Sequence, residues 1–192
     1  MNVSFLKINH MKRDYFDFNY SNSKRLSFKR YLVALMMMLS MSFAYAQETL
    51  IIVTTSNDPN WTASFTNIGG LSLQWNAIGP GINLTGTGDT PNFDFSPNAG
   101  NGNITITITS NDNFDKVTEF LAPTRNIVSV DLSNAENLVN LRLPNNQLNT
   151  IDLSTNILLT ELVLRNNPIS SIDLTTNTLL EKIQIQNNSL AT

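Results

Sequence analysis

The sequence predicts a mainly β fold, in which a β-rich amino-terminal segment precedes a short parallel-β solenoid. From Phe120 onward the same pattern of apolar residues and Asn returns every 21 residues, as at Leu141, Leu162 and Ile183. From Gln47 to about Asp115 short apolar runs alternate with Gly, Pro and Asn turns, and no convincing helical period is present. We therefore divide the chain into residues 1–46, 47–116 and 117–192.

Residues 1–46 have the features of a secretory signal peptide with a long polar n-region. Basic residues between positions 24 and 30 precede the apolar run 31–43, and Ala44-Tyr45-Ala46 has the small-x-small pattern of a cleavage site. The apolar run is short for a membrane span and is interrupted by serines. We expect a secreted or surface-displayed chain that begins at Gln47 and makes no membrane insertion after cleavage. Met1 and Met11 stay open as alternative start sites.

Removal of the leader limits the available chemistry. It takes away the single His, all six Met and all four Tyr, and the chain has no Cys. Without imidazole or thiol groups, most nucleophilic and metal-ligand constellations are excluded. We expect a protein that is not an enzyme and has no disulfide framework.

The charge also changes at the predicted cleavage site. Seven of the 12 Lys and Arg residues but only two of the 15 Asp and Glu residues lie in residues 1–46. Residues 47–192 therefore carry five basic and 13 acidic groups, a net charge of −8. An acidic surface repels phosphate groups, which argues against nucleic acid or anionic membrane as a partner.

Residues 47–116 are expected to form several short strands. Ile104, Ile106 and Ile108 alternate with threonines, which predicts a strand with one apolar and one polar face. This segment is either an independent β-sandwich-like module or a cap on the solenoid. The stretch 93–98 resembles the later IDLSxN pattern, and this favours the cap. Trp61 and Trp75 are expected in the core, with stacking on a sugar as the alternative.

Residues 117–192 repeat the unit LxxLxLxxNxLxxIDLSxNxxL. This unit resembles the 21-residue class of bacterial leucine-rich repeats called IRREKO repeats. The resemblance implies a curved parallel-β solenoid that binds other macromolecules, with LxL and IDL forming two half-turns of each coil.

Two polar ladders recur within the repeats. The first is Asn146, Asn167 and Asn188, and the resemblance implies that their amides bond backbone groups left unpaired at a turn. The second is Asp131, Asp152 and Asp173, each followed two residues later by Ser or Thr. Hydrogen bonds from nearby backbone and hydroxyl groups are expected to offset these carboxylates. A bound calcium ion is the alternative.

The positions between the inward leucines predict a ligand-binding face on the parallel strands. Three rows change chemistry from coil to coil: Asn140, Glu161 and Lys182; Arg142, Val163 and Gln184; Pro144, Arg165 and Gln186. A fourth row, Asn145, Asn166 and Asn187, does not change. Arg142 and Arg165 are the candidate anchors, because Arg is enriched at interfaces.

These features predict non-catalytic extracellular binding of a protein or glycan, as in adhesion. The alternatives are a structural spacer of a larger surface protein and a fragment of a carbohydrate-active enzyme. The chain ends soon after the third Asn turn without a polar capping coil, so we expect a longer natural protein. The apolar side chains of the last coil are then expected to cause self-association: Ile183, Ile185 and Leu190.

Overall fold

A computed structural model describes residues 47–67, 70, 72–110 and 112–191. The signal peptide expected in residues 1–46 lies outside the described residues and stays a prediction. Residues 47–192 form one compact unit of mainly β structure. Within the described residues, no helix has the length and apolar character needed to cross a bilayer.

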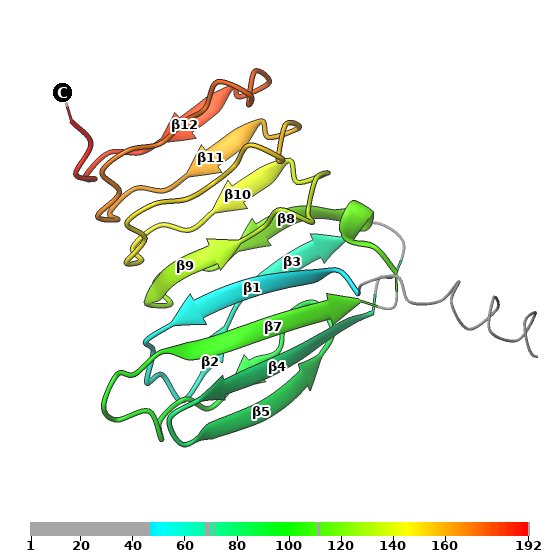
Figure 1. The fold of residues 1–192 in the computed structure, drawn as a ribbon, viewed down its shortest axis with the longest axis vertical. Coiled ribbons are helices and arrows are strands. Elements are labelled where there is room, and N and C mark those ends of the chain that lie inside the picture. The colour runs from blue at the N-terminus through cyan, green and yellow to red at the C-terminus, as the bar shows by residue number, and fades with distance from the viewer. Residues whose placement is uncertain (1–46, 68–69, 71, 111, 192) are drawn as a thin grey trace, which may run out of the picture. The chain divides into compact units, whose positions relative to one another are not determined.

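The first large sheet is antiparallel throughout (Figure 1). In spatial order its strands are β5 (Ile82–Thr87), β4 (Leu73–Gly79), β7 (Ile104–Ser110), β1 (Thr49–Thr54) and β9 (Ile127–Asp131). The predicted alternation of apolar and polar residues along β7 is confirmed. Ile104, Ile106 and Ile108 are fully buried, and the threonines between them are exposed or half-buried.

The second large sheet contains the repeat strands. In spatial order these are β12 (Lys182–Gln184), β11 (Glu161–Val163), β10 (Asn140–Arg142), β8 (Val117–Leu121) and β3 (Ser64–Asn67). The first four are parallel, and β3 runs antiparallel to β8. Leu141 pairs with Phe120 on one side and with Leu162 on the other. Each step between the parallel strands is therefore one 21-residue repeat.

Smaller elements complete the described part of the chain. The short strands β2 (Trp61–Thr62) and β6 (Asn92–Phe93) pair antiparallel, and a 3-10 helix, η1 (Phe114–Lys116), precedes β8. The close packing of β5 against the β6 region requires Gly86. A Cβ atom there would lie 2.9 Å from Pro91 Cβ and 3.0 Å from Phe93 Cζ.

The strands β10, β11 and β12 are only three residues long because the chain turns shortly after each. The turn needs a left-handed backbone, with φ of 57° at Asn145 and 59° at Asn166 and Asn187. Asn adopts this conformation more readily than other residues with a Cβ atom, because its short side chain bonds locally. Thr124 has the same conformation one repeat earlier, with φ of 58°.

The second half of each repeat is more loosely organised. In the first repeat it forms β9, but the equivalent positions 148–152 and 169–173 are not strands. Single backbone hydrogen bonds still join successive repeats there, from Gln147 N to Ile127 O at 2.8 Å and from Ser189 N to Ile169 O at 2.9 Å. Only the first half of the repeat therefore extends as a regular sheet.

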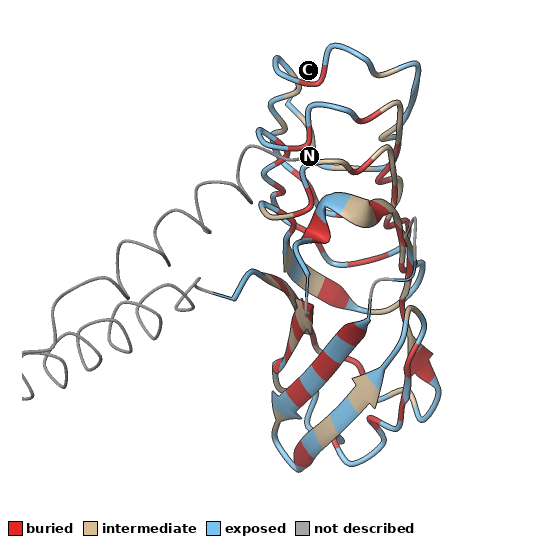
Figure 2. Ribbon diagram, turned by 90° about the vertical axis from the view of Figure 1, so that its right-hand side faces the viewer, coloured by how far each residue is buried: buried red, intermediate tan, exposed pale blue. Residues whose placement is uncertain are grey.

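Strands from both sides of residue 116 share each large sheet. β3 pairs with β8, and β1 pairs with β9. One buried hydrophobic cluster runs from Leu50 to Ile169, and Phe65 stacks on Phe120 with ring centroids 4.3 Å apart. Figure 2 shows buried and exposed positions alternating along the strands of the amino-terminal segment. This shared core favours a cap over an independent module.

Candidate binding face

The register of the parallel strands aligns the predicted rows across the second sheet. Asn140, Glu161 and Lys182 are direct neighbours, as are Arg142, Val163 and Gln184. The rows also extend one repeat earlier, because Glu119 pairs with Asn140 and Leu121 with Arg142. We call the residues of these strands and turns on this side of the sheet the ladder face.

The ladder face contains a depression of about 330 Å³. Of the nine candidate residues, all but Asn140 and Gln186 line it: Arg142, Pro144, Glu161, Val163, Arg165, Lys182 and Gln184. Leu121 and Pro123 also line it, and these were missed by the sequence reasoning. Stepping back 21 residues from Arg142 and Pro144 would have identified both.

Glu161 organises the charges of this depression. Its carboxylate accepts from Arg142 Nη2 and from Lys182 Nζ, each at 2.5 Å. The Glu161 side chain is 13% exposed, whereas those of Arg142 and Lys182 are 41% and 55% exposed. The hydrogen bonds from Arg142 and then Lys182 lower the pKa of Glu161, and the carboxylate in turn raises the pKa of Arg142. Glu161 therefore holds two cations at the rim.

Asn140 has an intramolecular role beside the depression. Its Nδ2 donates to Glu119 Oε1 at 2.7 Å, and Thr66 Oγ1 donates to the other oxygen of Glu119 at 3.0 Å. These bonds connect β3, β8 and β10 across the sheet. The Asn140 side chain is therefore held by a hydrogen bond within the protein, and one of its Nδ2 hydrogens is already used in that bond.

Two residues of the predicted exposed rows are buried. Val163 is only 6% exposed, because the longer side chains of Arg142 and Gln184 lie on the neighbouring strands about 4.8 Å away. Pro144 is buried in the row between Pro123 and Arg165. Period-two alternation predicts the side of a sheet correctly, but it does not predict how far neighbours cover a short side chain.

The fourth row belongs to the turn. Asn166 Nδ2 donates to Asn145 Oδ1 at 2.6 Å, and Asn187 Nδ2 donates to Asn166 Oδ1 at 2.7 Å. Together with the left-handed backbone, these bonds explain why Asn stands at every step of this row. Its constancy reflects turn geometry.

The ladder of Asn146, Asn167 and Asn188 satisfies backbone groups between repeats. Asn167 is representative: its Nδ2 donates to Leu143 O and Leu164 O, both at 2.9 Å, and its Oδ1 accepts from Leu148 N at 3.1 Å. Asn146 and Asn188 make the same kinds of bond. These contacts match the structural role expected of the ladder.

A second buried Asn ladder lies in the other half of the repeat. Asn156 Nδ2 donates to Leu132 O and Ala135 O, and Asn177 Nδ2 donates to Leu153 O and Asn156 O. The Oδ1 atoms of Asn156 and Asn177 are buried without a protein partner. The recurrence of these Asn positions is visible in the sequence, but the recurrence alone does not predict which backbone groups their side chains bond.

The Asp ladder lies on the IDLS half of the repeats. Asp131, Asp152 and Asp173 each accept from the backbone N–H two residues later, at 3.0, 2.9 and 2.9 Å. This backbone bond is the main cause that lowers the pKa of Asp152 and of Asp173. A depression of about 380 Å³ adjoins Asp152 and Asp173. In the described part of the chain, no cluster of three or more acidic, His or Cys side chains is arranged to hold a metal ion.

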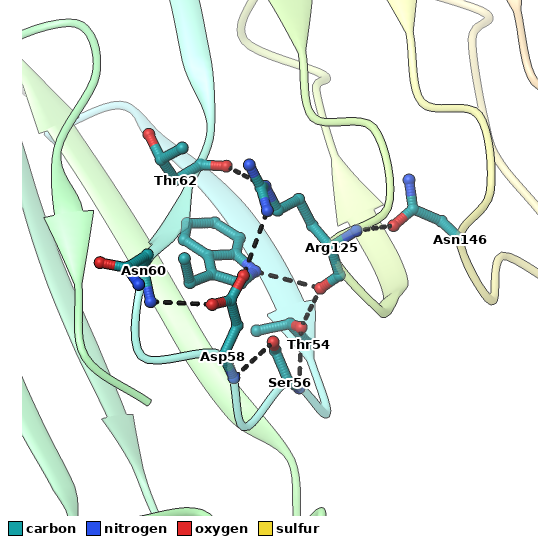
Figure 3. Close-up of polar contacts among 8 residues, drawn as sticks. Thr54, Ser56, Asp58, Asn60, Thr62, Arg125 and Asn146 are labelled. Carbon is teal, nitrogen blue, oxygen red and sulfur yellow. Dashed lines mark hydrogen bonds and ion pairs between the residues drawn. The ribbon is translucent and has the colours of Figure 1, made fainter. Parts of the chain in front are cut away.

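Arg125 joins the amino-terminal segment to the first repeat (Figure 3). It stands one repeat before Asn146, at the position that Asn occupies in later repeats. Its Nε donates to Thr62 O at 2.6 Å, and its Nη1 lies 3.2 Å from Asp58 Oδ2. Its own carbonyl accepts from Trp61 Nε1 at 3.0 Å and from Thr54 Oγ1 at 2.6 Å.

Both tryptophans are structural, so the sugar-stacking alternative is wrong for them in this fold. Trp61 is 0% and Trp75 is 1% exposed. Trp75 Nε1 donates to Gly88 O at 2.7 Å, and Trp61 donates to Arg125 as described. A buried indole that has its N–H bonded to the backbone presents no face to a ligand.

No family model matches this chain, and no curated protein matches it. The ladder face combines a depression, side-chain variation between repeats and paired charges.

Proposed function

We propose that this protein is a secreted or surface-displayed bacterial leucine-rich repeat protein that binds another protein through the ladder face, without catalysis. The observation that carries the proposal is the depression there, which is lined by seven of the nine candidate residues. Surface concavities with a few convergent polar groups are the usual ligand sites of proteins. The inward-facing positions of the repeat recur, whereas the side chains that line this site differ from one repeat to the next.

The repeat classification is supported by the 21-residue register. Successive parallel strands pair at equivalent positions, and the buried Asn ladder bonds neighbouring repeats. The amino-terminal segment supplies strands to both sheets at the first repeat, as a cap does. The secretory assignment is supported by the composition of residues 1–46.

A protein ligand is favoured over a glycan. The two Trp residues are buried, and the residues lining the depression include no aromatic side chain. The face instead combines Leu, Pro and Val with Arg and Lys, a mixture typical of protein interfaces with apolar cores and polar rims.

A selection of random displayed peptides on the purified chain tests this proposal. We expect enriched peptides that lose at least about tenfold in affinity for the double variant Arg165→Ala and Gln184→Ala. The matched control is Asp152→Ala with Ser154→Ala, which truncates two side chains at the other depression. Absence of enrichment, or equal loss in both variants, would contradict the proposal and favour the structural spacer.

A further inference from the structure

The cations of residues 47–192 are concentrated on the ladder face. This segment contains five Lys and Arg residues, and three of them line the depression: Arg142, Arg165 and Lys182. Of the 13 acidic residues, only Glu161 lines it. The residues that line the depression therefore sum to a charge of +2, with Glu119 near Arg142, in a segment whose net charge is −8. A local field of opposite sign attracts and orients an anionic partner.

Arg165 has hydrogen-bonding capacity to spare. Its guanidinium has no hydrogen-bond or ion-pair partner among the described residues, although the residue is only half-exposed. Arg142 Nε is also buried without a partner. A guanidinium offers five donors in a planar fork that matches a carboxylate. These unpaired N–H groups can therefore donate hydrogen bonds to a ligand that supplies an acceptor group.

Glu161 forms no hydrogen bond or ion pair with Arg165 in the described structure. Both of its oxygens are occupied, one by Arg142 Nη2 and the other by Lys182 Nζ. The same bonds hold these two cations in place before any ligand arrives, which reduces the entropy lost on binding. The depression thus contains two restrained cations and one available guanidinium.

Besides the three cations and Glu161, four of the five remaining lining residues are apolar, and the fifth is Gln184. Leu121 and Pro123 present the more accessible nonpolar surface beside the three cations, whereas Pro144 and Val163 line the depression but are largely buried. A ligand that fits both parts carries an aliphatic side chain next to an acidic one. Peptide segments provide this combination, because successive side chains of an extended chain differ freely.

We propose that the depression binds an acidic, aliphatic-containing peptide segment of a partner protein, with a carboxylate bonded in a bidentate manner to Arg165. This inference rests on the proposed function and specifies its ligand. Bidentate Arg–carboxylate pairs are stronger and more directional than single hydrogen bonds between neutral groups. Loss of the Arg165 guanidinium should therefore remove both affinity and charge selectivity.

The test is an immobilised array of peptides of random sequence whose net charge ranges from acidic to basic, probed with the purified chain. We expect binding to concentrate on peptides that contain Asp or Glu beside Leu, Ile or Val. Replacement of the acidic residues by their amides should lower affinity at least about tenfold. Binding should also weaken as salt is raised, because exposed charges are screened.

Two variants make the test specific. Arg165→Gln should abolish the preference for acidic peptides and lower their affinity about tenfold. Lys116→Gln is the matched control, because it removes one positive charge from a residue that pairs with Asp112 and does not line the depression. Its binding should be unchanged.

Peptide binding that ignores charge would overturn the inference and leave the proposed function intact. Equal binding of acidic peptides by Arg165→Gln would overturn the assigned site. Arg165-dependent binding of a polyuronate or sulfated polysaccharide, without peptide binding, would make the ligand a glycan. Arg165-dependent dimers in sedimentation would make the occupant a second copy of this chain. Absence of binding by every probe would reject both proposals.

Discussion

The amino-terminal segment and the repeats reach a buried core by different routes. Residues 47–110 contain antiparallel strands of up to seven residues, and four of the five aromatic ring contacts among the described residues lie within this segment. The later repeats use three-residue parallel strands, buried leucines and bonded Asn amides. The fifth ring contact, Phe65 with Phe120, lies where the two regions meet.

This difference shows which interactions each region depends on. A repeat is held by contacts to the repeat before and the repeat after, so its stability is close to a sum of neighbouring terms. The amino-terminal segment is held by contacts between residues far apart in sequence, such as Trp61 with Arg125. A destabilising substitution at the junction should therefore affect much of the molecule. The loss of folding stability should be smaller for substitutions closer to the last described repeat.

The largest expected effect concerns the row of inward-facing apolar residues that begins at Phe120. It tests whether the loss of folding stability becomes smaller toward the last described repeat. Phe120→Ala should lower the free energy of unfolding by about 3 to 5 kcal/mol, because a fully buried ring that stacks on Phe65 is lost. Ile183, at the equivalent position of the last repeat, is 47% exposed, so Ile183→Ala should cost under about 1 kcal/mol. Urea unfolding of both variants measures the difference. Equal losses would show that stability does not depend on position in the stack.

The next effect distinguishes the two Asn ladders. Asn167→Ala should cost about 2 to 3 kcal/mol, because three backbone groups lose a partner. Asn156→Ala should cost about 1 kcal/mol, since it also removes an unbonded buried oxygen. Ala135 already occupies the equivalent position in the first repeat and is buried. Thermal melting of the pair checks the order, and a larger loss at Asn156 would contradict it.

The junction is tested by making the first repeat resemble the later ones. Arg125→Asn removes the bond to Thr62 O and the ion pair with Asp58, and it should cost about 1 to 2 kcal/mol. Asp58→Asn serves as the partner variant in a double-mutant cycle. If the two changes prove additive, the ion pair contributes nothing to joining the regions. Two separate unfolding transitions in Arg125→Asn would show that this residue couples them.

The smallest effect concerns pH and the ladder face. The folded-state pKa of Glu161 is lowered by Arg142 and Lys182, so its stabilisation is present above the ordinary Glu value of about 4.3 and is lost as pH falls through the folded value. The melting temperature of the native chain should therefore begin to converge on that of Glu161→Gln as the pH falls below about 4.3, the ordinary Glu value. Calorimetry across this range measures it. A constant difference at all pH values would contradict the assignment to these ion pairs.

The residues that line the depression follow more directly from the sequence than the contacts at the junction do. Seven of the nine predicted residues line the depression, because a fixed period places equivalent residues on neighbouring strands. The burial of Val163 and Pro144 was not predictable from alternation, since it depends on the size of the side chains one repeat away. The role of Arg125 was also missed, because a single departure from a repeat does not show what replaces the missing bond.

The sequence by itself determined the 21-residue register, the inward leucines and the recurring Asn positions, because each repeat places the same residues in contact with its neighbours. The tertiary structure alone decided how the amino-terminal segment attaches. β1 and β3 each pair with a strand of the first repeat, and Asp58 meets Arg125 across 67 residues of chain. Such contacts follow no period and depend on how two separate sheets meet, so they become visible only when the whole chain is folded.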